Sequence, residues 1–443
     1  MKRRKAGKKK NVFFHFGITL VSLLLVAVSA FALEITNFWA EFVSSSNFIR
    51  VLFYPFLICL GVVLCGLIFR SALWLFYHPE KWSGNNRNHL PMVSVILPAY
   101  NEEDSVARAV EAIMNSDYPE SRLELICIND GSIDRTWEIL IGLKKKYSYR
   151  LRLINLKKNR GKRKAIYKGL KLARGEIIIT TDADSQVQRQ AIRNLILPLL
   201  KDNRVGAVAG RVAVLNEKKN LPTRMLTARY ALSFDFSRAY QSVYGGVLCS
   251  PGALSAFRRP VIKQVSGDWV RQKFLGVECN HGEDRSLTNL ILKKGYLVKY
   301  QSNAVVRTRV PETIKQINRM YLRWTRSYVR ESWFFIRFMV KPEKKKFSLL
   351  PAVDFFLELM LHPLHLLAIS LLAYSFLRSP EFILKQVVFL ICLNLAASLN
   401  NLKIQQGLKF LYGIPHGLFA FLFQWWIMPW ALLTAKNQDW LTK

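Results

Sequence analysis

The stretch EIIITTDAD, from Glu176 to Asp184, combines a strand pattern with two acidic residues at its end. Five strand-forming residues, Ile177 to Thr181, lead directly into Asp182 and Asp184, which one alanine separates. Such a run is typical of a strand buried on both faces of a parallel sheet, and ligands of these sheets collect at the carboxyl ends of the strands. Two carboxylates with this spacing can share a hard divalent cation with a phosphate oxygen. A strand that ends in an ordinary polar turn fits the same residues.

The composition indicates apolar membrane segments joined to a charged soluble part. Of 443 residues, 51% are hydrophobic and 21% are charged. Lys and Arg outnumber Asp and Glu by 65 to 30, which gives a formal net charge of +35. This excess fits nucleic acid, anionic substrates or an anionic membrane face, but positive cytoplasmic loops explain it directly. No nucleic-acid-reading module is recognisable, so we expect no nucleic-acid partner.

The six cysteines indicate reduced thiols. None belongs to a C-x-x-C pair or to a cluster of candidate ligands. The pattern argues against a secreted disulfide framework and against a zinc site.

The N-terminal part predicts two membrane spans within residues 11–77. The basic tail at residues 1–10 places the start of the first span on the cytoplasmic side. Val12–Leu33 is longer than the apolar region of a usual signal peptide and long enough to cross a bilayer. Val51–Phe69 is the second span, after which residues 78–91 read as a linker rich in Pro, Gly and Asn.

Residues 92–311 predict one cytosolic α/β domain. Expected strands at residues 93–100, 123–130, 151–156 and 177–181 alternate with helical segments at residues 102–115, 134–147 and 161–173. This order predicts a parallel, doubly wound sheet with right-handed crossovers.

The C-terminal part predicts a return to the membrane. Residues 312–340 form an amphipathic helix, rich in Arg and aromatic residues, of the kind that lies along a membrane face. Residues 347–434 then contain the apolar stretches Val353–Phe376, Val387–Leu399 and Phe410–Leu433. Three full spans would place the tail, residues 435–443, outside the cell, whereas a cytoplasmic tail requires one stretch to lie in the interface.

Two motifs in the first half suit a nucleotide. Asp130 ends the second expected strand in the sequence NDGS, so it should lie near Asp182 and can accept hydrogen bonds from a base or ribose. An Asp-Gly turn is the plain alternative. The segment NRGKRK, residues 159–164, opens a helix with Gly161 and three cations, which favours an anion. The GxxxxGK spacing of a phosphate-binding loop is absent, and a solvated basic helix start fits equally well.

Two motifs in the second half suit an acceptor and a leaving group. The sequence GEDR, residues 282–285, stands at an expected helix start, where Asp284 could act as a general base or where the acids could simply cap the helix. The sequence MYLRW, residues 320–324, is followed by Arg326 and Arg330 on the same helix. Guanidiniums bind diphosphates in bidentate fashion and Trp offers a flat wall to a sugar, although a basic helix on anionic lipid has the same pattern.

In this order the motifs resemble the processive, membrane-integrated synthases of glycosyltransferase family 2. That family shares a strand-end Asp, a D-x-D motif, an E-D or D-D base motif and a Q-x-x-R-W helix. Within it, the greatest similarity is to hyaluronan synthases and rhizobial chitin-oligosaccharide synthases, in the segments RAYQSVYGGVLCSPGALSAFRR (238–259), GEDRSLTNLILKKGY (282–296) and RWTRSYVRE (323–331). The resemblance runs from about residue 92 to 335 and implies a GT-A type domain inserted between N- and C-terminal transmembrane helices.

The resemblance implies donor-binding roles for residues of the first half. Asp130 would bind the uridine, and Gly161, Lys162 and Arg163 would line the nucleotide pocket. Asp182 would contact the UDP, and Asp184 would hold Mg²⁺ or Mn²⁺ on the diphosphate.

The second half would supply the acceptor side. Asp284 would deprotonate the acceptor hydroxyl, Arg323 would stabilise the leaving UDP, and Trp324 would form the floor under the acceptor sugar. Further substrate-binding positions implied by the motifs are Ser250, Gly252, Glu283, Arg285, Arg326 and, in a C-terminal gating segment, Trp440. One position departs from the family, because its Gln is Met320 here and a thioether cannot donate the amide's hydrogen bonds. This departure bears on acceptor positioning.

The implied activity is that of an inverting, processive polysaccharide synthase of the inner (plasma) membrane, multi-pass and with a cytoplasmic catalytic domain. It would transfer GlcNAc, alternating with glucuronic acid as hyaluronan synthases do, from UDP-sugar donors to a growing polysaccharide and export the product across the lipid bilayer. A chitin- or poly-N-acetylglucosamine-type synthase that uses UDP-GlcNAc alone is the close alternative. A lipid-carrier glycosyltransferase and a catalytically inactive binding protein are the other readings, and the sequence specifies no accessory export partner.

Overall fold

The computed structural model describes residues 43–44, 47–82, 90–339, 349–378, 391 and 407–438. The chain forms two compact units, one from residues 70–219, 233–353 and 427–443, the other from residues 1–69, 220–232 and 354–426. The predicted span Val12–Leu33, the basic tail and Trp440 lie outside the described residues, as does all but residue 391 of the stretch Val387–Leu399.

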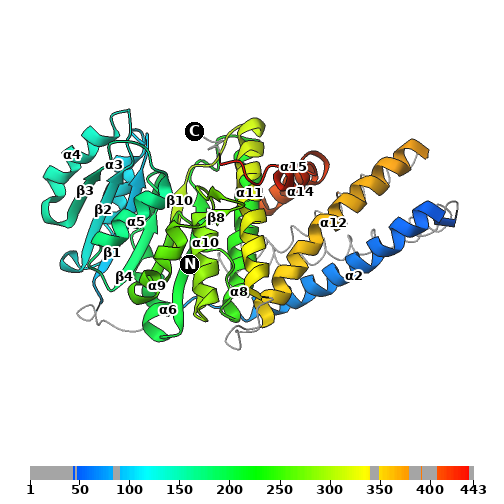
Figure 1. Cartoon of the computed structure of the whole chain (residues 1–443), viewed down its shortest axis with the longest axis horizontal. Coiled ribbons are helices and arrows are strands. Elements are labelled where there is room, and N and C mark those ends of the chain that lie inside the picture. The colour runs from blue at the N-terminus through cyan, green and yellow to red at the C-terminus, as the bar shows by residue number, and fades with distance from the viewer. Residues whose placement is uncertain are drawn as a thin grey trace, which may run out of the picture. The chain divides into compact units, whose positions relative to one another are not determined.

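An eight-stranded mixed sheet forms the centre of the larger unit, in the order β3-β2-β1-β4-β7-β6-β10-β5 (Figure 1). Its strands are β1 (Val93–Ala99), β2 (Leu123–Asn129), β3 (Leu151–Asn155), β4 (Ile177–Thr181), β5 (Ser185–Val187), β6 (Val205–Val214), β7 (Leu254–Arg258) and β10 (Leu297–Thr308). Every residue of β1, β2 and β4 is buried, as expected for apolar strands covered on both faces. The α/β expectation is therefore confirmed.

The sheet is parallel only in part, which corrects the expected all-parallel arrangement. The neighbours β3, β2, β1 and β4 are parallel, but β7 pairs antiparallel with both β4 and β6. The pair β6–β10 is again parallel, and β5 joins β10 antiparallel. The reversal arises because the chain enters β7 from the other end, so that Leu254 at its start pairs with Thr181 at the carboxyl end of β4. Ala253, directly before β7, is thereby brought to the edge at which β4 ends.

Helices cover the sheet and extend beyond it. They are α3 (Val106–Met114), α4 (Thr136–Tyr147), α5 (Lys162–Leu172), α6 (Ala191–Lys201), α8 (Ala239–Val243), α9 (Arg259–Val270), α10 (Glu283–Lys293), α11 (Ile314–Met339) and α15 (Ile427–Leu433). Shorter elements are η2 (Glu120–Arg122), η3 (Ser148–Arg150), the π-helix η4 (Leu232–Arg238) and the hairpin β8 (Lys273–Phe274) and β9 (Val277–Glu278). α5 packs on β1, β2 and α9, and α9 in turn packs on α10.

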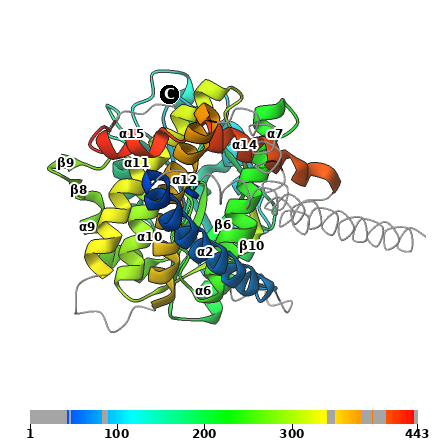
Figure 2. The same ribbon diagram turned by 90° about the vertical axis from the view of Figure 1, so that its right-hand side faces the viewer.

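The long helix α11 lies beside α10, and α15 packs against α11 (Figure 2). Its buried face carries apolar residues but also Arg326, Arg330 and Glu331. Charged side chains are rarely buried unless they are paired, so this face needs a structural or functional explanation. One face of the predicted amphipathic helix thus packs on protein.

The other unit contains apolar helices of membrane-spanning length. α2 (Asn47–Leu75) includes the candidate span Phe53–Leu75, and α12 (Leu349–Arg378) includes the candidate span Leu349–Leu377. Gly66 of α2 meets Leu357 of α12 so closely that an added Cβ would lie 3.1 Å from Leu357 Cδ1. The remaining elements are α7 (Leu221–Ala231), η6 (Gly407–Tyr412) and α14 (Gly413–Phe423).

The apolar stretch predicted at Phe410–Leu433 is broken in the structure. Lys409–Phe423 and Ile427–Leu433 are separate helical segments, and they count as a third candidate span of the described residues only if they are taken together. The long apolar helices that precede and follow the α/β domain along the chain agree with the predicted association with a membrane.

Candidate active site

Asp130 organises the loop that leads into α5. Its Oδ1 accepts a hydrogen bond from the Arg160 N–H and its Oδ2 one from the Gly161 N–H, each at 2.9 Å. Burial raises the pKa of Asp130, and the two backbone donors oppose that rise. Gly131 has a φ of +74°, and a Cβ there would lie 2.5 Å from the backbone carbon of Lys158. Asp130 and Gly131 together therefore hold residues 158–161 against the end of β2.

Lys162 joins the D-x-D motif at Asp182 to the GEDR motif at Glu283. Its Nζ lies 2.6 Å from Asp182 Oδ1 and 2.7 Å from Glu283 Oε1. These residues come from the start of α5, the end of β4 and the start of α10. Burial by itself would lower the pKa of Lys162, but the two carboxylates raise it above its usual value. Burial would likewise raise the pKa of Glu283, and Lys162 instead lowers it to about 2.

Gly252 lies directly beside this group of three charges. A Cβ at Gly252 would come within 2.7 Å of Lys162 Nζ and 3.7 Å of Asp182 Oδ1. Its position follows from the sheet, since Leu254 of β7 pairs with Thr181 and so brings the preceding residues to the end of β4. Only a residue without a side chain leaves the lysine in place there.

Asp184 lies at the same edge with an excess of negative charge around it. Its Oδ1 accepts hydrogen bonds from Ser185 Oγ at 3.1 Å and Thr308 Oγ1 at 3.4 Å. Burial and the charges of Asp182 and Glu102 raise the pKa of Asp184 to about 6. No three candidate ligands form a metal cage among the described residues. Oxygen ligands with surplus negative charge suit Mg²⁺ or Mn²⁺ shared with a substrate phosphate, so the residues fit the implied cation.

Asp284 is the second residue of α10 and faces Cys249, in the segment that precedes β7. Its Oδ1 accepts a hydrogen bond from the Arg285 N–H at 2.7 Å, and its Oδ2 lies 3.7 Å from Cys249 Sγ. Burial and the charge of Glu283 raise the pKa of Asp284. A raised carboxyl pKa strengthens the group as a proton acceptor.

Ser250, next to Cys249, is hydrogen-bonded to α10. Thr288 Oγ1 donates to the Asp284 carbonyl at 2.8 Å and accepts from the Ser250 N–H at 3.0 Å. Ser250 is buried, and its Oγ has no hydrogen-bond partner among the described residues. A buried hydroxyl of this kind is a candidate contact for a ligand.

The two residues of the R-W motif lie differently in α11. Arg323 is close enough to Glu283 for its charge to help lower that carboxyl's pKa, after the larger effect of Lys162. Trp324 is 40% exposed and packs edge-to-face on Tyr321, with ring centroids 5.8 Å apart. Met320 lies about one turn before Trp324 in the same helix and is buried.

Three predicted site residues make contacts within the protein. Arg163 is buried and donates to the Trp269 carbonyl at 2.9 Å and to Gln272 Oε1 at 2.8 Å. The guanidinium of Arg285 lies 4.5 Å from the ring centre of Tyr328, and Arg326 Nε donates to Thr434 Oγ1 at 3.0 Å. Adjacent residues of a helix point in directions 100° apart, so a run of cations cannot all face one ligand.

Sequence reasoning missed a clamp on the chain after α15. Arg330 donates to the Ala435 carbonyl at 3.0 Å and to the His281 carbonyl at 3.3 Å. The Asn280 N–H donates to Gln438 Oε1 at 2.9 Å. The C-terminal segment is thus fastened to the loop that precedes the base motif. The sequence signal was the presence of Arg330 on the buried face of an amphipathic helix.

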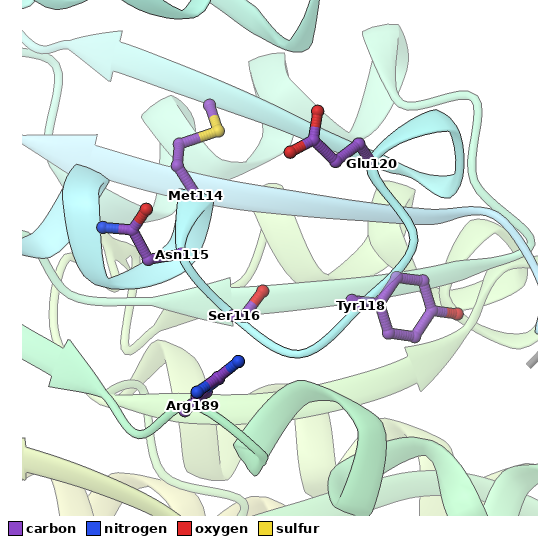
Figure 3. Close-up of a pocket in the computed structure, with 6 residues that line it drawn as sticks. All are labelled: Met114, Asn115, Ser116, Tyr118, Glu120 and Arg189. Atoms are coloured by element: carbon purple, nitrogen blue, oxygen red, sulfur yellow. The ribbon is translucent and has the colours of Figure 1, made fainter.

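A cavity of about 450 Å³ lies elsewhere, around the loop between α3 and η2 (Figure 3). Its lining residues are Met114, Asn115, Ser116, Tyr118, Glu120 and Arg189. None of them belongs to the motifs that converge at the ends of β2 and β4. We therefore locate the candidate active site at the carboxyl ends of β2 and β4, where Lys162, Asp182 and Glu283 meet.

Comparisons with known proteins show which proteins the chain is similar to. The sequence pattern of the family described as Glycosyl transferase family 2 matches residues 94–266. The chain is 30% identical to an N-acetylglucosaminyltransferase of Azorhizobium caulinodans over 354 residues, which cover 80% of this chain and 87% of that protein. It is also 30% identical to an N-acetylglucosaminyltransferase of Rhizobium meliloti over 362 residues, with 80% and 82% covered.

A solved structure shares the fold. It is a mannosyltransferase from Pyrobaculum calidifontis in complex with GDP-Man and Mn²⁺, and it superposes with a TM-score of 0.56 at 21% identity. The superposition covers 83% of this chain and 99% of the mannosyltransferase.

Proposed function

The chain belongs to glycosyl transferase family 2 and has the GT-A fold, and from this premise we propose that it transfers GlcNAc from UDP-GlcNAc to a growing β-linked glycan at a membrane. One observation carries the proposal. Lys162 holds Asp182 of the donor motif and Glu283 of the base motif within 2.7 Å of one ammonium group. The donor-binding strand end and the base-bearing helix start are thereby parts of a single site.

On the donor side, the chain's own residues bind and orient the nucleotide. Asp130 shapes the loop at Gly161, whose glycine conformation, with a φ of +89°, lets the backbone approach an anion. Lys162 can exchange a carboxylate for a phosphate oxygen without leaving its position. Asp184, with Asp182, would hold Mg²⁺ or Mn²⁺, which would supply positive charge to the diphosphate leaving group. The mannosyltransferase with GDP-Man and Mn²⁺ supports a nucleotide-sugar donor and a divalent cation.

On the acceptor side, Asp284 accepts the proton of the attacking hydroxyl. Its raised pKa and its place beside Ser250 and Cys249 support this role. The hydroxyl oxygen then forms a bond to the anomeric carbon as the bond from that carbon to the UDP oxygen breaks. A single displacement inverts the α-linked donor to a β-linked product, and Arg323 would stabilise the charge that develops on UDP.

The names of the relatives favour a glycan of GlcNAc alone over alternation with glucuronic acid. The relatives from Azorhizobium caulinodans and Rhizobium meliloti are both N-acetylglucosaminyltransferases. The hyaluronan-like alternative remains testable with the same assay. Processivity and export of the product belong to the proposal, and the candidate spans in the same chain as the transferase support them. Transfer of one sugar to a lipid carrier is the alternative without a polymer.

The decisive experiment incubates membranes that contain the protein with UDP-GlcNAc, with and without UDP-glucuronic acid. We expect a GlcNAc polymer or oligomer to form without the second donor. Product that requires both donors would overturn the GlcNAc-only version in favour of the hyaluronan-like one, and a product of one sugar on lipid would overturn the polymer.

The catalytic assignment is tested separately with Asp284→Asn, which keeps the volume but cannot accept the proton. We expect UDP release to fall by roughly 10²- to 10⁴-fold. Asp268→Asn, on the exposed face of α9, is the matched control and should leave activity unchanged. Unaltered UDP release by Asp284→Asn would contradict the proposed function.

A further inference from the structure

A buried hydrogen-bond network lies among α5, α9, α10 and α11, and Gln272 is its centre. Gln272 follows α9, and its Oε1 accepts hydrogen bonds from Arg163 Nη1 at 2.8 Å and from Ser286 Oγ. Its Nε2 donates to Glu331 Oε1 at 3.0 Å. Asn289 Nδ2 donates to Glu331 Oε2 at 3.3 Å and to the Glu331 carbonyl at 3.1 Å. Five side chains from four segments therefore meet here, two of them from α10.

The donors and acceptors of this network can be oriented in only one way. Arg163 is only a donor, so the amide oxygen of Gln272 must face it, and the Nε2 must face Glu331. Glu331 in turn receives donors from both Gln272 and Asn289. A carboxylate accepts on both oxygens, whereas an amide would place its own N–H₂ against one of the two donors.

Glu331 is an unusual residue for a fully buried position. It is 1% exposed, and burial raises its pKa to about 7 although Arg163 and two amides favour its charged form. A buried carboxylate carries a desolvation cost that an apolar side chain would avoid. The hydrogen bonds that Glu331 accepts from Gln272 and Asn289 offset part of that cost.

The members of the network adjoin the residues that we place at the active site. Arg163 is next to Lys162, and Ser286 lies two residues after Asp284. Glu331 follows Arg323 by about two turns of the same helix. Trp269, whose carbonyl accepts from Arg163, also donates its Nε1–H to the Glu283 carbonyl at 2.9 Å. The network thus connects the starts of α5 and α10 with α11.

We propose that Gln272 and Glu331 are positioning residues, which hold the donor-binding start of α5 and the base-bearing start of α10 in register with α11. The inference rests on the proposed function for the roles of those helix ends. Neither residue needs to touch substrate. A displacement of Asp284 relative to the donor by about 1 Å is enough to lower the rate of transfer by roughly 10²-fold.

The test is Glu331→Gln in the full-length protein, purified in detergent and assayed for UDP release. The substitution preserves volume but sets one amide N–H₂ against another. We expect kcat to fall roughly 10- to 100-fold while the KM for UDP-GlcNAc changes less than about threefold. Glu138→Gln, on the exposed face of α4, is the matched control and should behave as the parent protein.

The double variant Glu331→Gln with Gln272→Glu restores the match of donors and acceptors. The new carboxylate at position 272 accepts from Arg163, Ser286 and the new amide, whose oxygen accepts from Asn289. We expect this exchange to recover most of the lost kcat. If the single variant were slow only because packing was lost, the second substitution would not restore kcat. The double variant also tests the inference if the single variant folds poorly. A parental kcat in Glu331→Gln, or a double variant no better than the single one, would overturn the inference. Asp284→Asn, run alongside, reports separately on the proposed function.

Discussion

Lys162 Nζ lies 2.6 Å from Asp182 Oδ1, so the first residue of α5 closes on the residue that follows β4. The same nitrogen lies 2.7 Å from Glu283 Oε1 at the start of α10. Two carboxylates on one ammonium leave the group with a net negative charge. The donor's metal-bound diphosphate would therefore enter a site in which a cation is already positioned and partly shared.

Replacing Lys162 with Met should weaken donor binding. The change removes a charge-assisted contact worth about 1.5–3 kcal/mol, which corresponds to a rise of roughly 10- to 150-fold in the KM for UDP-GlcNAc. Steady-state kinetics in membranes measures this. Lys168→Met, on the exposed side of the same helix, is the control. An unchanged KM for Lys162→Met would contradict the assignment of Lys162 to the donor.

Gly252→Ala should impair transfer with little effect on folding. Its Cβ would lie 2.7 Å from Lys162 Nζ, so the flexible lysine end must leave at least one of its carboxylates. We expect a loss of roughly tenfold in kcat/KM, equivalent to about 1.4 kcal/mol. Gly267→Ala in α9 is the control, since its Cβ meets nothing closer than 3.7 Å and Ala favours a helix. Equal activity of the two variants would argue against a tight fit at Gly252.

The pH profile of kcat should report on Asp284. The base must be deprotonated, so activity is present above its pKa and lost as the pH falls through it. Because burial and then Glu283 raise the pKa of Asp284, we expect the acidic midpoint to lie above the ordinary Asp value of about 3.9. Glu283→Gln removes one raising charge and should move the midpoint to lower pH. Glu278→Gln, at an exposed pair with Lys164, should not move it.

Arg330→Met should release the chain that follows α15. The side chain is fully buried and donates to the carbonyls of Ala435 and His281. We expect faster amide hydrogen exchange in residues 434–438 and 279–282, with a loss of stability of about 1–3 kcal/mol. Arg337→Met, on the exposed side of α11, should change neither. Unchanged exchange in both segments would show that Arg330 does not fasten them.

Part of the fold followed from local pattern. The run Ile177–Thr181 is apolar and β-branched enough to predict a buried strand, and β4 spans those residues with none of them exposed. The alternation of strands and helices predicted the parallel neighbours β3, β2, β1 and β4. The reversal at β7 was not predictable in this way, because it depends on the path of residues 215–253 and not on the strand's own residues.

What the sequence by itself determined is the first four strands, β1 to β4, the position of Asp182 and Asp184 at a strand's carboxyl end, and the order of the motifs. These depend on residue type and spacing, which act over a few positions. Only the tertiary structure decided that Lys162 faces the strand ends while Arg163 turns to Trp269 and Gln272. Neighbouring helix residues point 100° apart, and the packing of α5 between the sheet and α9 selects which of the two cations reaches the ligand edge.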